Sequence, residues 1–259
     1  MYQNLIFENR DGVVRITLNR PDVYHALSPA LIAEITNAIQ VAAEGDSVRV
    51  VLLTATGDKA FCSGADLKEA TTSGKSAGEI LRDYYEPMVT AIRDIPKPVL
   101  CRMNGLAVGA GCSLALACDT IIAAEDTYLS LAFAQIGLMP DAGATFMLPR
   151  LIGMARSFEL ASTGRRISAA EARQIGLITQ AVARETLDEE TEKLVGYYRH
   201  APTRAIGEMK RAFNQSMHSN LTQMLETERE SQEMLFGTQD VREGIAAFLE
   251  KRKPDFQGI

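Results

Sequence analysis

The sequence NGLAVGAGC, residues 104–112, is the stretch of this 259-residue chain that says most about its fold. Three of its nine residues are glycines, and the apolar run that follows at 114–118 is typical of a buried helix. Small residues let backbone amides approach a ligand closely, and amides at a helix N-terminus carry partial positive charge that suits an oxyanion. Glycines also let a helix pack tightly on its neighbours. The stretch therefore predicts either an oxyanion site or a close helix contact.

Two further segments combine glycine with small or polar residues. They are FCSGADL at 61–67 and GLMPDAGAT at 137–145. None of the three segments has the GxGxxG spacing or the P-loop pattern. The sequence therefore gives no support for a nucleotide-phosphate site.

The segments lie within alternating strand and helix patterns. Expected strands lie at 5–8, 13–18, 48–54, 99–102 and 120–123, and expected helices at 29–43 and 77–94. Asp11-Gly12 between the first two apolar runs predicts a β-hairpin. Strands that alternate with helices predict an α/β architecture.

The last third of the chain has a different character. Helical periodicity dominates after residue 182, over 187–200, 203–217, 221–236 and 241–251. We interpret the final 60 or so residues as an oligomerisation or lid module. Helices that simply pack on the core are the alternative.

Composition excludes several classes of protein. Hydrophobic residues make up 46% of the chain and charged residues 23%, which is ample for a core and rules out disorder as the dominant state. The formal net charge of −6 argues against a general nucleic-acid binder. Four cysteines without CxxC spacing favour reduced thiols and a cytoplasmic protein. Residues 1–10 lack the pattern of a signal peptide, and the most apolar stretch, 105–118, is too short to span a bilayer.

Seven segments, in order along essentially the whole chain, resemble the crotonase, or enoyl-CoA hydratase/isomerase, superfamily. They are LNRP (18–21), FCSGADL (61–67), NGLAVGAGC (104–112), ACD (117–119), GLMPDAGAT (137–145), AEA to GL (170–177) and EG to FLEKR (243–252). The resemblance implies an α/β crotonase-like spiral of ββα turns. It also implies an acyl-CoA-binding core over 1–200 and a helical trimerisation region over 201–259.

The resemblance further implies an acyl-CoA thioester as substrate and a homotrimer or dimer of trimers as the assembly. Coenzyme A is then part of the substrate, so we expect no separate cofactor and no metal. We expect neither a nucleic acid nor a membrane as a partner.

The resemblance assigns the binding residues by position. The backbone amides of Ala65 and Ala110 correspond to the pair that holds the thioester oxygen, and backbone groups near Ser63, Ala65 and Leu67 correspond to those that accept the adenine. Phe133 is placed beside the acyl group, and Lys251 is the candidate that reaches coenzyme A from a neighbouring subunit. The remaining expected contacts in the same two loops are Gly64, Asp66 and Gly109.

The chain departs from the hydratase pattern at three positions. Ser113 and Phe133 stand where hydratases carry their two catalytic glutamates, and Asp141 stands where they usually have glycine. Hydration needs two carboxylates around one water, whereas an isomerase needs one base that removes and returns a proton. An aspartate here resembles the isomerase branch, most closely the ring-1,2-epoxyphenylacetyl-CoA isomerase type. We therefore expect an acyl-CoA isomerase with Asp141 as proton shuttle, its pKa raised by an apolar wall of Phe133 and Leu138.

Other interpretations stay open at this point. Asp141 could cap a helix. The chain could be a hydratase, a hydrolase, or a dehalogenase with Asp141 as nucleophile, although dehalogenases also use a Trp and a His, and this chain has no Trp. A non-catalytic RNA-binding member is a further alternative, which the net charge of −6 opposes.

Four other side chains have simpler interpretations. Asp66 is interpreted as a structural hydrogen-bond or capping residue, and His25 as a packing residue. Tyr84 and Tyr85 lie in the helix that shapes the acyl pocket and are candidates for lining it.

Overall fold

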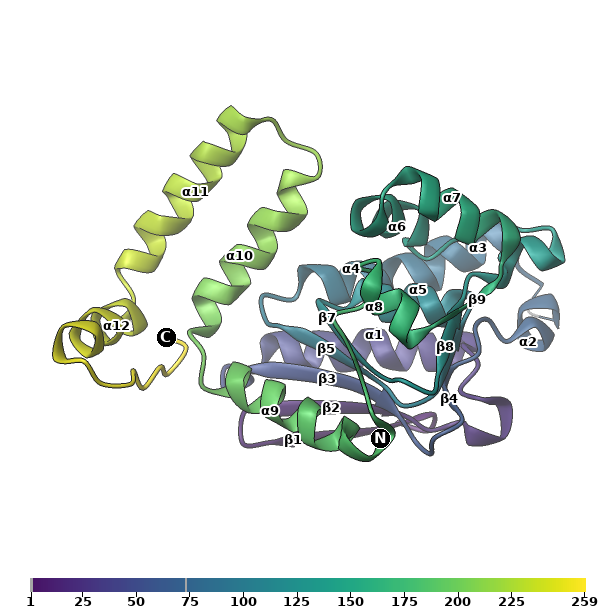
Figure 1. Ribbon diagram of the computed structural model, residues 1–259, viewed down its shortest axis with the longest axis horizontal. Coiled ribbons are helices and arrows are strands. Elements are labelled where there is room, and N and C mark those ends of the chain that lie inside the picture. The colour runs from purple at the N-terminus through teal and green to yellow at the C-terminus, as the bar shows by residue number, and fades with distance from the viewer. Residues whose placement is uncertain (1, 73) are drawn as a thin grey trace.

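The computed structural model describes residues 2–72 and 74–259, and two β-sheets form its centre (Figure 1). The larger sheet has the order β1-β2-β3-β5-β7-β10, and the smaller has the order β4-β6-β8-β9. The larger sheet comprises β1 (Leu5–Arg10), β2 (Val13–Leu18), β3 (Val50–Ala55), β5 (Val99–Met103), β7 (Thr120–Ala124) and β10 (Gln180–Val182). The smaller comprises β4 (Ala60–Cys62), β6 (Leu106–Val108), β8 (Tyr128–Ser130) and β9 (Arg166–Ser168).

The first two strands form the predicted hairpin. β1 and β2 pair antiparallel over their full length, with Leu5 opposite Leu18. Asp11 and Gly12 both have positive φ, at 52° and 80°, as a two-residue turn that matches the twist of the strands requires. The hairpin prediction is confirmed.

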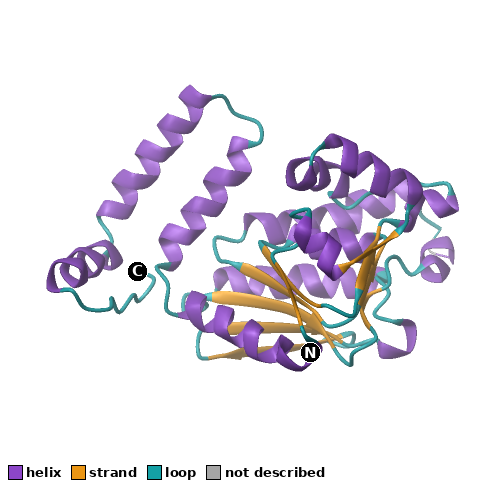
Figure 2. Ribbon diagram, in the orientation of Figure 1, coloured by secondary structure: helices purple, strands orange, loops and turns teal. Residues whose placement is uncertain are grey.

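Beyond the hairpin, each pass of the chain places one strand in each sheet. β3 is followed by β4, β5 by β6, and β7 by β8, and the pairings from β2 to β10 and from β4 to β8 are parallel. Helices then return the chain to the next pass, so that the repeating unit is strand, strand, helix (Figure 2). The expected α/β spiral of ββα turns is confirmed.

The helices of the body lie around the two sheets. They are α1 (Pro29–Glu44), α2 (Leu67–Thr72), α3 (Ala77–Ile80), α4 (Glu86–Asp94), α5 (Ala110–Ala117), α6 (Ala144–Ile152), α7 (Met154–Thr163), α8 (Ala169–Gln174) and α9 (Leu187–Arg199). The helix expected at 77–94 is divided by a π-helical turn, η2 (Leu81–Tyr85). A π-turn inserts an extra residue, which hydrophobic periodicity does not reveal.

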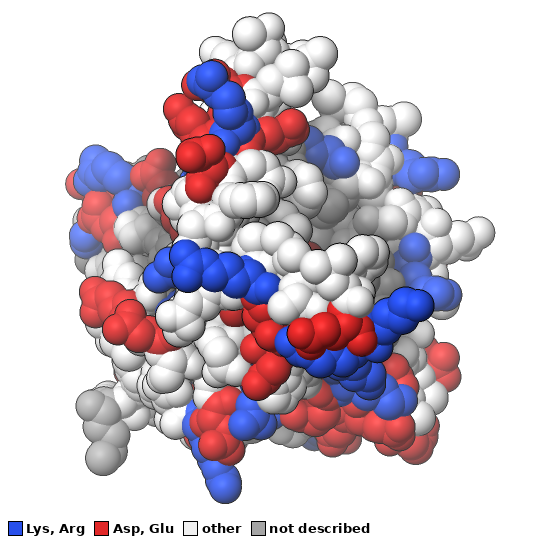
Figure 3. All heavy atoms as spheres, turned by 90° about the vertical axis from the view of Figure 1, so that its left-hand side faces the viewer, with Lys and Arg blue, Asp and Glu red and all other residues white. Residues whose placement is uncertain are grey.

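Three helices extend away from the body at the C-terminal end (Figure 1). They are α10 (Thr203–Ser216), α11 (Leu221–Phe236) and α12 (Gln239–Glu250). Large apolar side chains on them are exposed: Met209, Phe213, Leu221, Leu225, Met234, Phe236, Ile245, Phe248 and Leu249. Figure 3 views this end and shows uncharged surface between clusters of Lys or Arg and of Asp or Glu.

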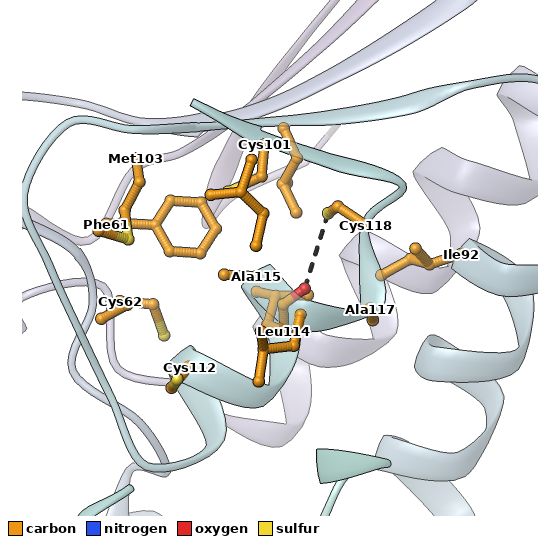
Figure 4. Packing of buried hydrophobic residues seen from close by; sticks show 14 of the residues in the cluster. Phe61, Cys62, Ile92, Cys101, Met103, Cys112, Leu114, Ala115, Ala117 and Cys118 are labelled. Atoms are coloured by element: carbon orange, nitrogen blue, oxygen red, sulfur yellow. Dashed lines mark hydrogen bonds between the residues drawn. The ribbon is translucent and has the colours of Figure 1, made fainter. Parts of the chain in front are cut away.

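The hydrophobic core lies around α5. All eight residues of this helix are buried, which explains why its sequence has no polar face. Phe61 of β4 and Met103 of β5 are fully buried beside this helix (Figure 4). The Cys118 thiol, just after the helix, donates to the Leu114 carbonyl at 3.6 Å. In the part of the chain that the structure describes, no helix is long and apolar enough to cross a membrane.

Candidate active site

The first half of the candidate site is the loop that follows β4. Leu27 and Ala65 form an isolated parallel β-bridge. In it the Leu27 N–H donates to the Gly64 carbonyl at 2.7 Å, and the Asp66 N–H donates to the Leu27 carbonyl at 3.0 Å. Because a parallel bridge uses the groups on either side of the central residue, the N–H of Ala65 points away from Leu27.

The second amide belongs to the first residue of α5. Ala110 opens this helix, so its N–H has no carbonyl partner within the helix. Gly109 precedes it with φ 53° and ψ −128°, a conformation that favours glycine, and its own N–H donates to the Ser130 carbonyl at 2.8 Å. The amide that the resemblance assigns to the oxyanion hole is therefore at a helix N-terminus, where partial positive charge is greatest.

The two amide-bearing turns are in contact. A Cβ atom added to Gly64 would lie 3.5 Å from the Ala110 nitrogen and 2.8 Å from the Val108 carbonyl oxygen. A Cβ added to Gly111 would lie 2.3 Å from the Cys62 carbonyl oxygen. Gly64 and Gly111 thus permit the approach of α5 to the end of β4 that brings Ala65 and Ala110 together. The glycine-rich stretch therefore forms a close helix contact and also places the Ala110 amide at a helix N-terminus.

Asp141 is the candidate acid of the site. It lies in the turn before α6, where Ala142 and Gly143 both have positive φ, 49° and 83°. Its Oδ1 atom is buried and has no hydrogen-bond partner among the described residues. Burial raises the pKa of Asp141 to about 6. A carboxyl with that pKa can both accept and release a proton near neutral pH.

The capping interpretation of Asp141 is wrong. The N-cap of α6 is Gly143, and no side chain bonds to the first turn of that helix. Asp141 contributes only its backbone carbonyl, which accepts from the Ala144 N–H at 3.0 Å. The two left-handed residues carry the chain through the turn, so the carboxylate is not drawn to the helix end.

The two residues of the expected apolar wall differ in burial. Phe133 is buried, in the same hydrophobic cluster as Ala110 and with Ala142 packed against that cluster. Leu138 is 53% exposed, since it follows the 3-10 helix η3 (Ala132–Ile136) in a turn at the surface. The role of the two residues beside the Asp141 carboxyl stays a prediction.

The two positions of the hydratase glutamates hold no acid. Ser113 is buried in α5, and its hydroxyl makes only a long hydrogen bond of 3.5 Å to the Gly109 carbonyl. Phe133 is buried and apolar. Of the three positions at which the chain departs from the hydratase pattern, Asp141 alone carries a carboxylate.

Asp66 has structural partners. Its Oδ2 accepts from the Arg20 guanidinium at 3.1 Å, and its Oδ1 accepts from the Glu69 N–H at 3.2 Å in the first turn of α2. His25 is buried, and its Nδ1 accepts from the Arg20 N–H at 3.0 Å. Its Nε2 lies 3.0 Å from the Thr56 carbonyl oxygen, and burial lowers the pKa of the ring. Both residues hold the loop in place, as their interpretation as structural residues requires.

The other predicted binding residues lie in two places. Ser63, whose hydroxyl donates to the Val23 carbonyl at 3.3 Å, and Leu67, which is 52% exposed, flank the Ala65 loop. Lys251 ends α12 with φ 56°, at the opposite end of the molecule from α2 and β4 (Figure 1). The single chain does not bring Lys251 to the loop.

No group of three or more His, Cys, Asp or Glu side chains suited to a metal ion occurs within residues 2–72 and 74–259. The chemical groups of the candidate site are the backbone amides of Ala65 and Ala110 and the partly buried acid Asp141. Such a site suits a carbonyl compound that forms an enolate, with the amides at the oxygen and the carboxyl at carbon.

The fold and these residues define an acyl-CoA enzyme of the crotonase type, and comparison with known proteins identifies the family. The family model described as "Enoyl-CoA hydratase/isomerase" matches residues 8–258. The chain belongs to the enoyl-CoA hydratase/isomerase family.

Individual relatives differ in their named activities. The chain is 41% identical over 257 residues to the "Probable enoyl-CoA hydratase" of Rhodobacter capsulatus, covering 99% of both proteins. It is 36% identical over 262 residues to the "1,2-epoxyphenylacetyl-CoA isomerase" of Escherichia coli, covering 100% of both. A particular likeness to the epoxide isomerase is therefore not shown, because the relative named as a hydratase is the more identical of the two.

Solved structures agree with the fold. The crystal structure of an enoyl-CoA hydratase from Bacillus anthracis superposes with a TM-score of 0.91 at 37% identity, covering 99% of this chain and 100% of that one. The structure of an enoyl-CoA hydratase from Mycobacterium smegmatis gives a TM-score of 0.91 at 33% identity, with 98% and 99% covered.

Proposed function

We propose that the protein is a cofactor-independent isomerase of an unsaturated or ring-containing acyl-CoA thioester. Asp141 moves the proton, and the amides of Ala65 and Ala110 hold the thioester oxygen. The observation that carries the proposal is the partly buried carboxyl of Asp141: its Oδ1 is buried without a partner among the described residues, and burial raises its pKa to about 6. The glutamate positions of hydratases hold Ser113 and Phe133 instead.

The proposed reaction needs nothing beyond the substrate. The Asp141 carboxylate takes a proton from one carbon of the acyl chain, and the electron pair of that C–H bond moves through the conjugated system onto the thioester oxygen. The Ala65 and Ala110 amides stabilise the resulting enolate. The Asp141 carboxylic acid then returns the proton at a different carbon, which shifts the double bond or rearranges the ring. No water is consumed and no electron is transferred to another molecule.

The test is a panel of 3-enoyl-CoA, 2-enoyl-CoA and aromatic-epoxide CoA thioesters, with products identified by mass spectrometry. We expect an isomer of unchanged mass and little product that has gained 18 Da of water. Asp141→Asn should lower kcat by about 100- to 10,000-fold, the usual contribution of a positioned acid or base, and should leave thioester binding intact. Isomerisation that survives in Asp141→Asn would contradict the proposal.

Hydration is the second candidate function. It is favoured by the relatives named as hydratases, including the "2,3-dehydroadipyl-CoA hydratase" of Escherichia coli at 35% identity over 255 residues, covering 98% of both proteins. Against it stands the lack of a carboxylate at Ser113 and Phe133, because syn addition of water uses one acid and one base. A mass gain of 18 Da from 2-enoyl-CoA at a rate that exceeds isomerisation would establish hydration.

We also propose that the chain acts as a homotrimer or a dimer of trimers, with residues 201–259 as the oligomerisation region. The exposed apolar side chains of α10, α11 and α12 support it, because a lone chain rarely leaves so much apolar surface uncovered. The distance between Lys251 and the site is also consistent with a contribution from a neighbouring subunit. Light scattering should give three or six times 28.3 kDa, and the mass of a single chain would contradict it.

A further inference from the structure

Helix α4 packs on the turn that carries Asp141. A Cβ atom added to Gly143, two residues after Asp141, would lie 3.2 Å from Cγ1 of Val89 in α4. Val89 and Ala142 both pack against the main hydrophobic cluster. Because burial is what raises the pKa of Asp141, the position of α4 over this turn bears on the acid itself.

Arg93 lies one helical turn after Val89, on the same face of α4, and its guanidinium bonds to three other segments. Its Nη1 donates to the carbonyl of Ala117, the last residue of α5, at 3.2 Å. The same Nη1 donates to Oδ1 of Asp119, which directly precedes β7, at 3.1 Å. Its Nη2 donates to Oδ1 of Asn214 in α10, and Nδ2 of Asn214 in return donates to the Arg93 carbonyl at 2.9 Å. Arg93 therefore ties α4 to α5 and to α10.

Helix α5 carries the other half of the candidate site at its opposite end. Its first residue is Ala110, whose amide is assigned to the oxyanion hole, and its last residue is Ala117. Arg93 contacts the Ala117 end, where a cation also interacts favourably with the helix dipole. Helix α4 thus joins the helix of the amide half to the turn of the acid half.

The partners of Arg93 are themselves held in place. Oδ2 of Asp119 accepts from the Val99 N–H at 2.8 Å and from the Lys210 ammonium at 2.7 Å. Lys210 is 7% exposed and also donates to the Ile92 carbonyl at 2.8 Å. The Arg93 Nε is buried without a partner among the described residues, and desolvation offsets much of the attraction in a partly buried ion pair. The cluster is therefore better suited to fixing geometry than to adding stability.

We infer that Arg93 is a positioning residue for the candidate site: its guanidinium fixes α4 against α5 and α10, and α4 in turn keeps the Asp141 turn covered. This inference rests on the proposed function and adds a residue that acts through a helix rather than at the substrate. Without these bonds α4 shifts, water reaches the carboxyl, and the pKa of Asp141 falls toward that of an ordinary aspartate. Tyr85 of η2, on which the charge of Asp141 acts, has a raised pKa and stays neutral in this range.

The test compares Arg93→Met with Arg102→Met as the matched control. The two side chains are 19% and 20% exposed, and each pairs with one aspartate. Arg102, however, donates to Asp188 of α9 and not to the cluster at the end of α4. The measurement is exchange of substrate C–H protons for deuterium from D₂O, followed by mass spectrometry on 3-enoyl-CoA over pH 4.5–8.5. Light scattering ensures that variants of equal mass are compared.

We expect Arg93→Met to slow exchange at alkaline pH about tenfold, because misplaced reacting groups react much more slowly. The acidic limb of the rate profile should move downward by about one pH unit, because a better hydrated carboxyl has a lower pKa. Arg93→Lys keeps the charge, but its single nitrogen does not span the three partners, so it should restore only part of both effects. Arg102→Met should keep the wild-type rate and limb.

A wild-type rate and limb in Arg93→Met would overturn the inference. So would slower exchange or lower stability with an unmoved limb, which would indicate a purely structural role. An equal effect of Arg102→Met, or full restoration by Arg93→Lys, would also overturn it. If Arg93→Met fails to fold, Asn214→Ala removes the bonds from the α10 side, and alanine favours the helix. Asn214→Ala should move the limb in the same direction, and an unmoved limb would count against the inference in the same way.

The experiment also separates this inference from the proposed function. Asp141→Asn is run beside the arginine variants. Exchange that persists in Asp141→Asn would remove the proposed function itself. Exchange that is lost in Asp141→Asn but unaltered in rate and pH profile in Arg93→Met would remove only the role of Arg93.

Discussion

The amide half of the site is made of backbone, whereas the acid half depends on one side chain. Ala65 and Ala110 contribute N–H groups that any residue would have, and their position comes from glycines that let α5 touch the end of β4. Asp141 contributes a carboxyl whose properties come from its burial. Substitutions should therefore damage the amide half through packing and stability, and the acid half through charge and proton transfer.

Gly111→Ala should have the largest effect on stability. The new Cβ would lie 2.3 Å from the Cys62 carbonyl oxygen, which is backbone and cannot move aside cheaply. We expect the free energy of unfolding to fall by about 3 kcal/mol, at the upper end for overpacking, as measured by urea denaturation. Gly196→Ala in α9 is the matched control, because nothing lies within 4 Å of its Cβ, and it should stabilise the helix slightly. Equal stability of the two variants would show that the contact between Gly111 and Cys62 does not set the position of α5 against β4.

Asp141→Asn should stabilise the protein at alkaline pH. The folded-state pKa of about 6 lies above the ordinary value of an aspartate, about 3.9, so the folded chain binds the proton more tightly than the unfolded chain does. The cost of burying the charge is therefore absent below pH 4, grows between pH 4 and 6, and is complete above pH 6. We expect the variant to exceed the wild type by about 1 kcal/mol at pH 8, less than the full pKa shift implies because solvent screens a partly buried charge, and to match it near pH 4, by urea denaturation.

The control is Asp22→Asn, which alters an exposed carboxylate and should change stability little at either pH. A destabilised Asp141→Asn at pH 8 would show that the carboxylate is satisfied in the folded protein, and the contrast between the two halves would then fail.

The pH dependence of catalysis should follow the same group. Because the base must be ionised, kcat/KM should decline as the pH falls through about 6, the pKa of Asp141 in the free enzyme. Initial rates over pH 4.5–8.5 measure it. If kcat/KM declines only near pH 4, the ionising group that limits catalysis is not Asp141.

Asp66→Asn should have a smaller effect, on stability alone. It removes the charge that faces Arg20 but keeps an oxygen that can cap α2. We expect a loss of about 1 kcal/mol that shrinks at high salt, with kcat unchanged. Glu69→Gln removes the other, more exposed partner of the same guanidinium and should cost less. A fall in kcat without loss of stability would make Asp66 part of the chemistry.

Ser113→Ala should have the smallest effect. The hydroxyl makes one long hydrogen bond within its own helix, and alanine favours helices. We expect stability within about 0.5 kcal/mol of the wild type and an unchanged kcat. A tenfold loss of kcat would give Ser113 a catalytic role.

The sequence predicted the parts of the fold that depend on local patterns. Asp11-Gly12 predicted the hairpin because its turn type needs two positive φ angles. The strands of the smaller sheet, such as β4 with three residues, are too short for periodicity to identify. The sequence also did not predict that α5 begins at Ala110. Ala110-Gly111 resembles a loop, and its helical conformation depends on the contact of Gly111 with Cys62.

The candidate site could be predicted only as a set of segments. The sequence named Ala65, Ala110 and Asp141 through a resemblance, and the structure shows Ala65 and Ala110 on turns that touch. The exposure of Leu138 and the contact of Val89 with Gly143 depend on tertiary packing between elements far apart in the chain. The π-helical turn that divides the helix expected at 77–94 has no sequence signal that we recognise.

The burial of the four cysteines lowers their reactivity toward electrophiles. An enoyl thioester is an electrophile, and thiolates are the protein groups that it would alkylate most readily. All four cysteines are buried, and Cys62 lies directly beside the Ala65 loop with the pKa of its thiol raised to about 12. At neutral pH only about one in 100,000 copies of such a thiol is ionised. Alkylation of Cys62 by an enoyl thioester bound at the proposed site should therefore be slow.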